Sequence, residues 1–248
     1  MVEPSIFPIM AEYASLDKND VALDIGAGFG FLTHFLASKC KDVLAVEADN
    51  KLEKALHEHL ADLANIQIIK GNVLKVQIPN FNKVVSIPPY QISSRLLVWL
   101  FNRENFDCAV LIFQKEFANR LVASIGSEDY GWLTILAYYY VECDLLDDVP
   151  RAMFYPQPEV DSIIVRLRLR QQKLFVLNAE ALFTKLVQSL FTQRNRKVRN
   201  AVMPFLRGIQ ARTPEDAARI VVKLPFRDTR VRELSPEDFG VLANALCD

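Results

Sequence analysis

One short stretch of the chain, "LDIGAGFGFLT" from Leu23 to Thr33, places three glycines between an apolar strand and a helix. The run Val21–Ile25 is short and continuously apolar, which is typical of a strand buried on both faces of a parallel sheet. Glycine at Gly26, Gly28 and Gly30 allows the backbone to turn tightly and to approach a ligand closely. The loop therefore restricts the chain to folds in which a strand leads through a ligand-binding turn into the start of a helix.

Strand-like and helix-like segments alternate through the first two-thirds of the chain. Strands are expected at Val21–Ile25, Val43–Ala48, Ile66–Gly71, Lys83–Ile87, Phe106–Gln114 and Ser162–Arg170. Helices are expected between them at Phe31–Lys39, Lys51–Asp62 and Ser93–Phe101. This spacing indicates right-handed βαβ units on a parallel sheet that helices cover on both faces. The expected fold class is therefore α/β and Rossmann-like.

The end of the chain follows a different pattern, which is helical from about Leu177 onward. Thr213 and Ser235 are each followed by a proline and two acids, which indicates an N-cap residue with proline at the first helical position. Acids in the first turn stabilise a helix because they lie at its positive end. We expect a boundary near residues 171–175. It divides the chain into an α/β domain, 1–172, and a small helical domain, 173–248.

Composition narrows the class of protein without identifying a partner. Of the 248 residues, 51% are apolar and 24% are charged, as in ordinary globular proteins, and the net charge is −1. No apolar run reaches the ~18 residues of a membrane span, and the first residues lack the pattern of a secretory signal. Scattered cysteines argue against a zinc site or a disulfide framework. We expect a cytoplasmic monomer that binds no metal.

The spacing of the glycines predicts the kind of ligand. A dinucleotide-binding loop would have G-x-G-x-x-G, whereas G-x-G-x-G suits a ligand without a pyrophosphate, such as S-adenosyl-L-methionine. The carboxylate of that cofactor would bind the helix end, and its sulfonium would lie near Asp24. Glu47 ends the next strand about 20 residues after Gly26, where an acid can bind both ribose hydroxyls. The alternative is a tight turn followed by a solvated acid.

A third strand end adds Asn72, in the segment "GNVL". Its side-chain oxygen can accept a hydrogen bond from the adenine amine, although without charge assistance. An asparagine that only forms a turn is the alternative. The predicted cofactor-binding residues are Asp24, Gly26, Ala27, Gly28, Glu47, Ala48, Asn72 and Val73.

A second turn, in "KVVSIPPYQISS" from Lys83 to Ser94, follows the fourth strand with two prolines and a tyrosine. Turns of this shape occur in enzymes that methylate exocyclic amines of bases. The N6 nitrogen of adenine is a poor nucleophile because its lone pair is delocalised into the ring. Acceptors for its hydrogens and an aromatic ring that fixes the base assist its attack. The carbonyl of Pro88 and the ring of Tyr90 fit these roles. The predicted catalytic residues are Ile87, Pro88, Pro89 and Tyr90.

Four segments together resemble the KsgA-type small-subunit ribosomal RNA adenine dimethyltransferases. They are "LDIGAGFGFLT", "FQKEFANRLVASIGSEDYG", "DVPRAMFYPQPEVDSIIVRL" and "LFTQRNRKVRNA", in that family's order. The box at Phe154–Ser162 and the basic helix after it are the most specific. The resemblance implies a class I methyltransferase sheet that uses S-adenosyl-L-methionine to dimethylate N6 of adenines in small-subunit ribosomal RNA, with a role in ribosome biogenesis. The helical tail would help to hold the RNA.

Three features depart from the family's pattern. The family motif N-[LI]-P-[YF] aligns without gaps so that Ile87 takes the place of the asparagine, which removes an acceptor and predicts weakened transfer. One alternative is that the turn is rotated, so that Ser86 replaces the lost acceptor. Another is that Ile87 has no part in the chemistry and simply extends the buried strand. Asn72 stands where the family has an aspartate. The family's basic N-terminal segment, which ends in Q-x-F-L-x-D-P, is expected here only in its last part, because the chain starts at "VEPSIF".

The basic run "TQRNRKVRN", Thr192–Asn200, predicts contact with RNA phosphates. The residues concerned are Arg194, Arg196, Lys197 and Arg199. A solvated, charged helix is the alternative interpretation.

Three functions therefore compete. The principal prediction is an RNA adenine N6-methyltransferase that depends on S-adenosyl-L-methionine. The second is a ribosome-assembly factor that binds the RNA of the pre-small subunit with weak or no methyl transfer, because Ile87 replaces the asparagine. The third is a methyltransferase for another amine, since the Pro-Pro-Tyr turn also occurs in DNA amino-methyltransferases.

Overall fold

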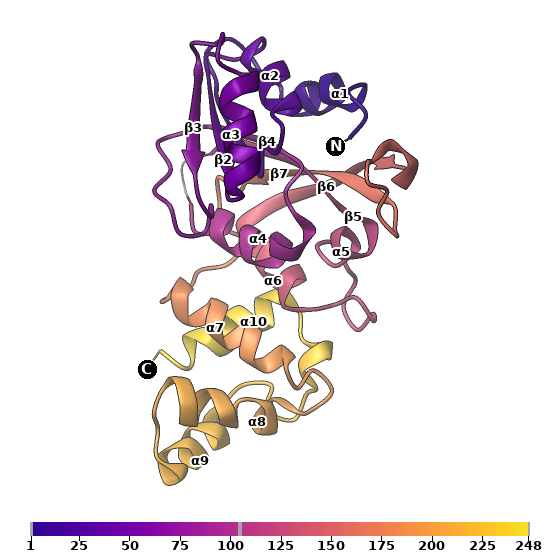
Figure 1. Ribbon diagram of the computed structural model, residues 1–248. Coiled ribbons are helices and arrows are strands. Elements are labelled where there is room, and N and C mark those ends of the chain that lie inside the picture. The colour runs from indigo at the N-terminus through magenta and orange to yellow at the C-terminus, as the bar shows by residue number, and fades with distance from the viewer. Residues whose placement is uncertain (1, 104–105, 248) are drawn as a thin grey trace. The chain divides into compact units, whose positions relative to one another are not determined.

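A mixed sheet organises the first part of the chain in a computed structural model that describes residues 2–103 and 106–247 (Figure 1). The strand order is β3-β2-β1-β4-β5-β7-β6. The strands are β1 (Val21–Ile25), β2 (Asp42–Glu47), β3 (Ile66–Lys70), β4 (Lys83–Ser86), β5 (Cys108–Gln114), β6 (Val141–Val149) and β7 (Ser162–Leu169). The first five pair in parallel, and β7 runs antiparallel to both of its neighbours. The α/β, Rossmann-like prediction is confirmed.

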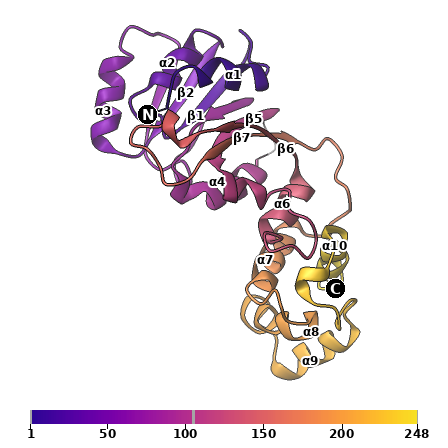
Figure 2. The ribbon, with the colours of Figure 1, turned by 90° about the vertical axis from the view of Figure 1, so that its right-hand side faces the viewer.

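Helices cover both faces of this sheet, as Figure 2 shows for α1 and α2 on one side and α4 on the other. The helices are α1 (Ile6–Tyr13), α2 (Phe31–Ala37), α3 (Asn50–His59), α4 (Ser93–Phe101) and α5 (Lys115–Asn119). One apolar core joins α1 and α2 to the strands. The central strand β5 is buried at every residue except its last. Burial on both faces explains why its sequence is continuously apolar and does not alternate.

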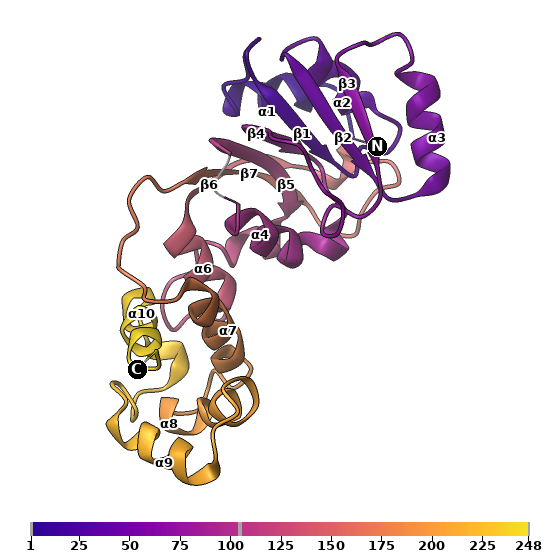
Figure 3. The ribbon, with the colours of Figure 1, turned by 90° about the vertical axis from the view of Figure 1, so that its left-hand side faces the viewer.

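The remaining helices form a second compact unit with part of the middle of the chain. Residues 119–140 and 170–248 cluster together, whereas the rest of the chain clusters around the sheet. The helices of this second unit are α6 (Trp132–Tyr140), α7 (Glu180–Phe191), α8 (Val198–Ala201), α9 (Pro214–Lys223) and α10 (Pro236–Asn244). Helix α7 packs against both α6 and α10, and Figure 3 shows α7 beside α10.

The division between the units bears on the expected domains 1–172 and 173–248. The last crossing between units falls after Leu169, close to the expected boundary. The chain also enters the helical unit earlier, at residues 119–140, which the sequence did not indicate. Tyr139 accounts for this placement, because its ring lies 4.9 Å from that of Phe175 and 5.4 Å from that of Phe183.

Local sequence signals explain where several helices begin. The hydroxyl of Thr213 accepts a hydrogen bond from the N–H of Asp216, and Ser235 forms a capping box with Asp238. Both predicted N-caps are confirmed. In the stretch expected to be helical from about Leu177 onward, however, helix α8 is short. It ends at Ala201, and a wider π turn follows at Phe205–Ile209. Proline at position 204 lacks the N–H that would continue the helix.

No described helix is long and apolar enough to cross a membrane. The described ranges also contain no group of three or more histidine, cysteine, aspartate or glutamate side chains that is arranged to hold a metal ion.

Candidate active site

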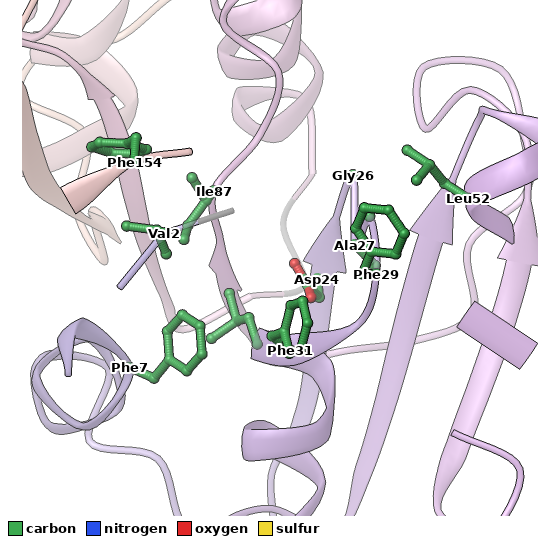
Figure 4. A pocket seen from close by; sticks show the side chains of 12 residues that line it. Val2, Phe7, Asp24, Gly26, Ala27, Phe29, Phe31, Leu52, Ile87 and Phe154 are labelled. Atoms are coloured by element: carbon green, nitrogen blue, oxygen red, sulfur yellow. The ribbon is translucent and has the colours of Figure 1, made fainter. Parts of the chain in front are cut away.

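A cavity of about 240 Å³ lies where the turns after β1 and β4 meet (Figure 4). These strands are parallel neighbours, so their carboxyl ends lie at the same edge of the sheet, where ligands bind in open α/β folds. Asp24, Gly26, Ala27, Gly28 and Ile87 line the cavity. The structure therefore brings together predicted residues from two segments about 60 positions apart.

Apolar side chains that the sequence interpretation did not select complete the lining. They are Val2, Phe7, Phe29, Phe31, Leu32, Leu52 and Phe154. Phe29, Phe31 and Leu32 belong to the glycine-loop stretch and Phe154 to the Phe154–Ser162 box, although none of them was predicted as a site residue. No periodic signal drew attention to α1, so neither Phe7 nor Val2 was expected at the site. A short antiparallel bridge pairs Val2 with Phe154, which fixes both at the cavity.

Gly26 connects the two turns directly. Its φ of 74° is in the left-handed region, and a Cβ placed on it would come within 2.7 Å of Pro89 Cδ. Any other residue would therefore clash with the second proline of the β4 turn. The N–H groups of Gly26 and Ala27 both donate to the carbonyl of Val46, at distances of 2.8 and 3.1 Å. The loop is thus held against the end of β2, and the first N–H groups of α2 have no partner within the helix.

Asp24 is the buried charge of the site, with 2% of its surface exposed. Burial raises the pKa of Asp24 to about 7. The neighbouring hydroxyls of Thr33 and Ser86 oppose the shift, and the charge of Glu47 adds to it. Thr33 Oγ1 donates to Asp24 Oδ2 at 2.7 Å. No basic side chain contributes to this shift among the described residues. A buried carboxyl group without a basic partner, at the wall of a cavity, fits a ligand that carries positive charge.

Glu47 has three backbone partners at the end of β2. Its carboxylate accepts from the N–H groups of Gly28, Ala48 and Asp49, at 2.8 to 2.9 Å. A carboxylate offers about four lone-pair directions, so one remains. To bind both hydroxyls of a ribose, Glu47 would exchange at least one of these backbone contacts. The interpretation of Glu47 as a solvated acid does not hold, because only 7% of its surface is exposed.

Asn72, just after the end of β3, forms a turn with its side chain. Asn72 Oδ1 accepts from the N–H of Leu74 at 2.9 Å. This bond leaves one acceptor direction on the oxygen and both amide hydrogens for other partners. The neighbouring Val73 is buried, and Ala48 is exposed beside Glu47. Four of the predicted cofactor-binding residues do not line the cavity, so their contact with a cofactor remains a prediction: Glu47, Ala48, Asn72 and Val73.

Ser86 does not face the cavity. Its hydroxyl accepts from the N–H of Ile25 at 2.9 Å and donates to the carbonyl of Ile25 at 2.8 Å, and the side chain is fully buried. It therefore joins β4 to β1 where their ladder ends. Ser86 could accept a hydrogen bond from a substrate only if it gave up these bonds to Ile25. The structure therefore does not contain the rotated turn that would bring Ser86 into the place of the family's asparagine.

Ile87 lies among apolar side chains on one side of the cavity. Figure 4 shows it beside Val2 and Phe154, with Phe29 and Leu52 on the opposite side. It also packs against the core that includes Phe7. Ile87 thus both follows the buried strand and lines the cavity, so the two interpretations of this residue are compatible.

The rest of the turn supplies one acceptor and one aromatic ring. Pro89 has its carbonyl bonded to the N–H of Ile92 at 3.1 Å, whereas the Pro88 carbonyl accepts no hydrogen bond from the described residues. Tyr90 is half-buried, and its hydroxyl lies 2.8 Å from Ser162 Oγ. Burial raises the pKa of Tyr90, and the hydrogen bond to Ser162 partly opposes this. The turn is therefore anchored to the start of β7, at the end of the Phe154–Ser162 box.

Comparison with known proteins identifies the family. The model for the family described as ribosomal RNA adenine dimethylase matches residues 2–236. This chain belongs to the ribosomal RNA adenine dimethylase family. A probable ribosomal RNA small subunit methyltransferase A from Methanosarcina acetivorans is 40% identical over 237 residues, which cover 95% of this chain and 86% of the relative. A protein of the same description from Methanopyrus kandleri is 34% identical, covering 99% and 89%.

Solved structures of dimethylases and related methyltransferases share the fold over nearly the whole chain. A dimethyladenosine transferase from Plasmodium falciparum has a TM-score of 0.79 and 25% identity, covering 98% of this chain and 95% of that one. The 23S rRNA methyltransferase ErmE has a TM-score of 0.66 and 26% identity, with 98% of each chain covered. Both similarities extend through the helical unit and are not limited to the sheet. The class I methyltransferase fold with a helical C-terminal part is therefore confirmed.

Most of the basic side chains predicted to bind RNA form hydrogen bonds or ion pairs within the protein itself. Arg194 donates to the carbonyls of Ser127 and Glu128, at 2.7 and 2.6 Å. Asp228 forms ion pairs with Arg199 and, at 3.8 Å, with Lys197. Among the four residues predicted to bind RNA, only Arg196 has a side chain without a partner in the described part of the chain.

Proposed function

We propose that this chain transfers methyl groups from S-adenosyl-L-methionine to N6 of adenines in small-subunit ribosomal RNA, as part of small-subunit biogenesis in the cytoplasm. The observation that carries the proposal is the direct contact between the two turns, where Pro89 packs on Gly26. In a family of ribosomal RNA adenine dimethylases, this contact supports a cofactor loop and a base-methylating turn that act at one cavity, which the glycine loop and Ile87 line. We propose that it acts as a monomer.

The residues on the glycine-loop side suit the cofactor. The cofactor supplies a methyl group on a positively charged sulfur. Asp24 would stabilise that charge, because its buried carboxyl group has no basic partner among the described residues. Glu47 would bind the ribose hydroxyls after exchanging a backbone contact, and the N–H groups at the start of α2 would hold a carboxylate. Ala27 and Gly28 would form the wall along which the cofactor lies.

The residues on the other side suit an adenine. The free carbonyl of Pro88 would accept one N6 hydrogen, which turns the nitrogen lone pair toward the methyl group. Tyr90 would stack on the base, with its ring fixed by the bond to Ser162. No strong base is required, because the N6 proton becomes acidic once the methyl group has been transferred, and water can take it.

A second candidate function rests on Ile87. This side chain occupies the place of the family's asparagine, and Ser86 cannot replace the lost acceptor without breaking its bonds to Ile25. Losing one preorganised acceptor typically costs about 3–4 kcal/mol, or ~10²–10³ in rate. The alternative is therefore a ribosome-assembly factor that binds the RNA with very slow transfer.

The deciding experiment measures methyl transfer by mass spectrometry of the RNA. Small ribosomal subunits that lack adenine dimethylation would be incubated with S-adenosyl-L-methionine and this chain. Dimethyladenine formed over several turnovers per protein molecule is the expected result. If RNA binds but no methylated adenine appears, the assembly-factor function replaces the enzymatic one.

An Ile87→Asn variant tests the cause of slow transfer. We expect kcat to rise by ~10²–10³, because the variant regains an acceptor beside the carbonyl of Pro88. Ile87→Val is the matched control, since it also shortens the side chain but adds no acceptor, and it should leave kcat nearly unchanged. An equal rate for the original chain and Ile87→Asn would show that the turn does not depend on an acceptor at this position.

A further inference from the structure

A shallow hollow of about 530 Å³ lies on the helical unit, well separated in sequence from the cavity residues. It is lined by Gln193, Arg196, Asn200, Met203, Pro204 and Arg207. All of these residues come from one continuous stretch that begins just after α7 and extends into the π turn. The shape of the hollow therefore depends only on local folding within the helical unit.

The hollow carries positive charge that the protein does not neutralise. Arg196 and Arg207 are both exposed, and in the described part of the chain neither guanidinium has an acidic partner or a hydrogen bond. Asp228 is not available to them because it pairs with Lys197 and Arg199. A guanidinium group presents a planar set of donors that matches the oxygens of a phosphate.

The same hollow offers groups that suit a nucleobase. The side-chain amides of Gln193 and Asn200 make no hydrogen bond to described residues, and each has both a donor and an acceptor. Such a pair of groups can bind the edge of an unpaired base. Met203 and Pro204 add apolar surface against which the face of a base can pack.

The backbone beneath the hollow is firmly anchored. Val202, Phe205 and Leu206 are fully buried, and the N–H of Gln210 bonds to the carbonyl of Phe205 at 3.1 Å across the π turn. Turns of this width are frequent at functional sites. The anchoring keeps Arg207 on a rigid support, so little conformational entropy of the backbone is lost when a ligand binds.

We propose that this hollow binds a single unpaired nucleotide of the RNA substrate. Arg196 and Arg207 contact the phosphates, the amides of Asn200 and Gln193 contact the base edge, and Met203 packs against the base. The proposal rests on the proposed function for the identity of the ligand as RNA. It adds a site at which the helical unit distinguishes unpaired from duplex RNA.

The first test measures the affinity for transcribed small-subunit ribosomal RNA over a series of salt concentrations. The double variant Arg196→Gln with Arg207→Gln should bind at least tenfold more weakly in low salt. The slope of log affinity against log salt should fall by about 0.7 for each lost phosphate contact. Arg219→Gln is the matched control, because Arg219 is also an exposed arginine but lies on α9, outside the hollow. An equal loss for the control would overturn the proposal.

The second test asks whether a base is recognised. A single-stranded oligoribonucleotide and its duplex with a complementary strand would compete for the protein against the transcript. We expect the single strand to compete about tenfold better, and Asn200→Ala to remove most of this preference. Equal competition by the duplex would show phosphate binding only and would overturn the recognition of an unpaired nucleotide. Melting curves establish that each variant is folded.

Methyl transfer measured on the same preparations separates this site from the proposed function. The arginine variants should raise the KM for RNA and leave kcat unchanged, because the hollow binds substrate and does not touch the methyl group. If the original chain transfers no methyl group while the arginine variants still lose RNA, the function fails and the site stands. If the original chain methylates RNA and the double variant leaves both affinity and KM unchanged, the site fails.

Discussion

The two sides of the cavity differ in how their residues are satisfied. On the glycine-loop side, Glu47 is surrounded by backbone N–H groups and Asp24 receives a hydroxyl hydrogen bond. On the side of the β4 turn, Ile87 meets Val2 and Phe154 without a polar group (Figure 4). Polar groups are thus held in place on one side, whereas on the other side the proposed acceptor is the main-chain carbonyl of Pro88, which accepts no hydrogen bond from the described residues.

This difference teaches where the chemistry of the site is vulnerable. On the glycine-loop side, several backbone hydrogen bonds hold the carboxylate of Glu47 in place. The geometry of that side is therefore kept when one neighbouring side chain is changed. The wall that includes Ile87 relies on shape and on a single carbonyl, so one substitution can alter the rate without disturbing the fold. The contact of Gly26 with Pro89 is where the two walls meet.

The largest effect that could sharpen this comparison concerns Asp24 and pH. Its pKa is raised in the folded protein from the ordinary 3.8 to about 7, first of all by burial. Between these values the folded protein binds the proton more tightly than the unfolded chain, so the free energy of unfolding falls as pH rises. The fall amounts to at most about 4 kcal/mol. Urea unfolding from pH 4 to pH 8 should show this dependence in the original chain and lose it in Asp24→Asn. Parallel profiles for the two proteins would contradict the assignment.

A smaller effect on kcat is expected when the contact between Gly26 and Pro89, where the two sides of the cavity meet, is disturbed. Gly26→Ala would place a Cβ 2.7 Å from Pro89 Cδ, which displaces the turn and should lower kcat by ~10². Gly126→Ala is the matched control, because Gly126 also has a positive φ, of 79°, but a Cβ there would meet nothing within 4 Å and the residue does not line the cavity. Both variants bear the cost of the left-handed backbone, about 1–2 kcal/mol. Steady-state kinetics should show the loss of kcat in Gly26→Ala alone, and equal losses would mean that the contact with Pro89 is unimportant.

The smallest effect tests whether Ser86 belongs to the fold or to the chemistry. Ser86→Ala removes both hydrogen bonds to Ile25 and should lower the free energy of unfolding by about 1–2 kcal/mol. The rate of methyl transfer per folded molecule should change much less than the stability, because the hydroxyl does not line the cavity and acts on the site only through the pKa of Asp24. Thermal melting and single-turnover transfer measure the two quantities. A loss of transfer with unchanged melting would identify Ser86 as the missing acceptor.

The sequence predicted the elements that a local pattern defines. Val21–Ile25 was recognised as a buried strand because it is continuously apolar, and the structure contains it with the same bounds. Thr213 and Ser235 were recognised as N-caps because capping depends on a hydroxyl and its neighbours along the chain. The glycine loop and the turn after β4 lie against each other because parallel strands end at the same edge, although Ile87 is the one predicted residue of that turn in the cavity lining.

What the sequence could not predict depends on partners that lie far along the chain. An apolar helical pattern at 132–140 does not say which core it joins, and α6 packs with α7 and α10. An arginine in a basic run does not reveal a nearby carbonyl, so the contacts of Arg194 with residues 127 and 128 were not foreseen. The same limit applies to one partner of Glu47, the N–H of Gly28, which reaches it only once the loop has closed on β2.

The early entry of residues 119–140 into the helical unit has a consequence for synthesis on the ribosome. Helix α6 emerges before most of its unit, yet its buried side chains, including Leu133, Ile135 and Leu136, pack in a unit that is completed only by α10 near the end of the chain. At about 5–20 residues per second, the interval between the two is on the order of ten seconds. During that time the apolar side chains of α6 have no packing partners from α7 and α10. We therefore expect nascent chains of intermediate length to aggregate more readily than the complete protein.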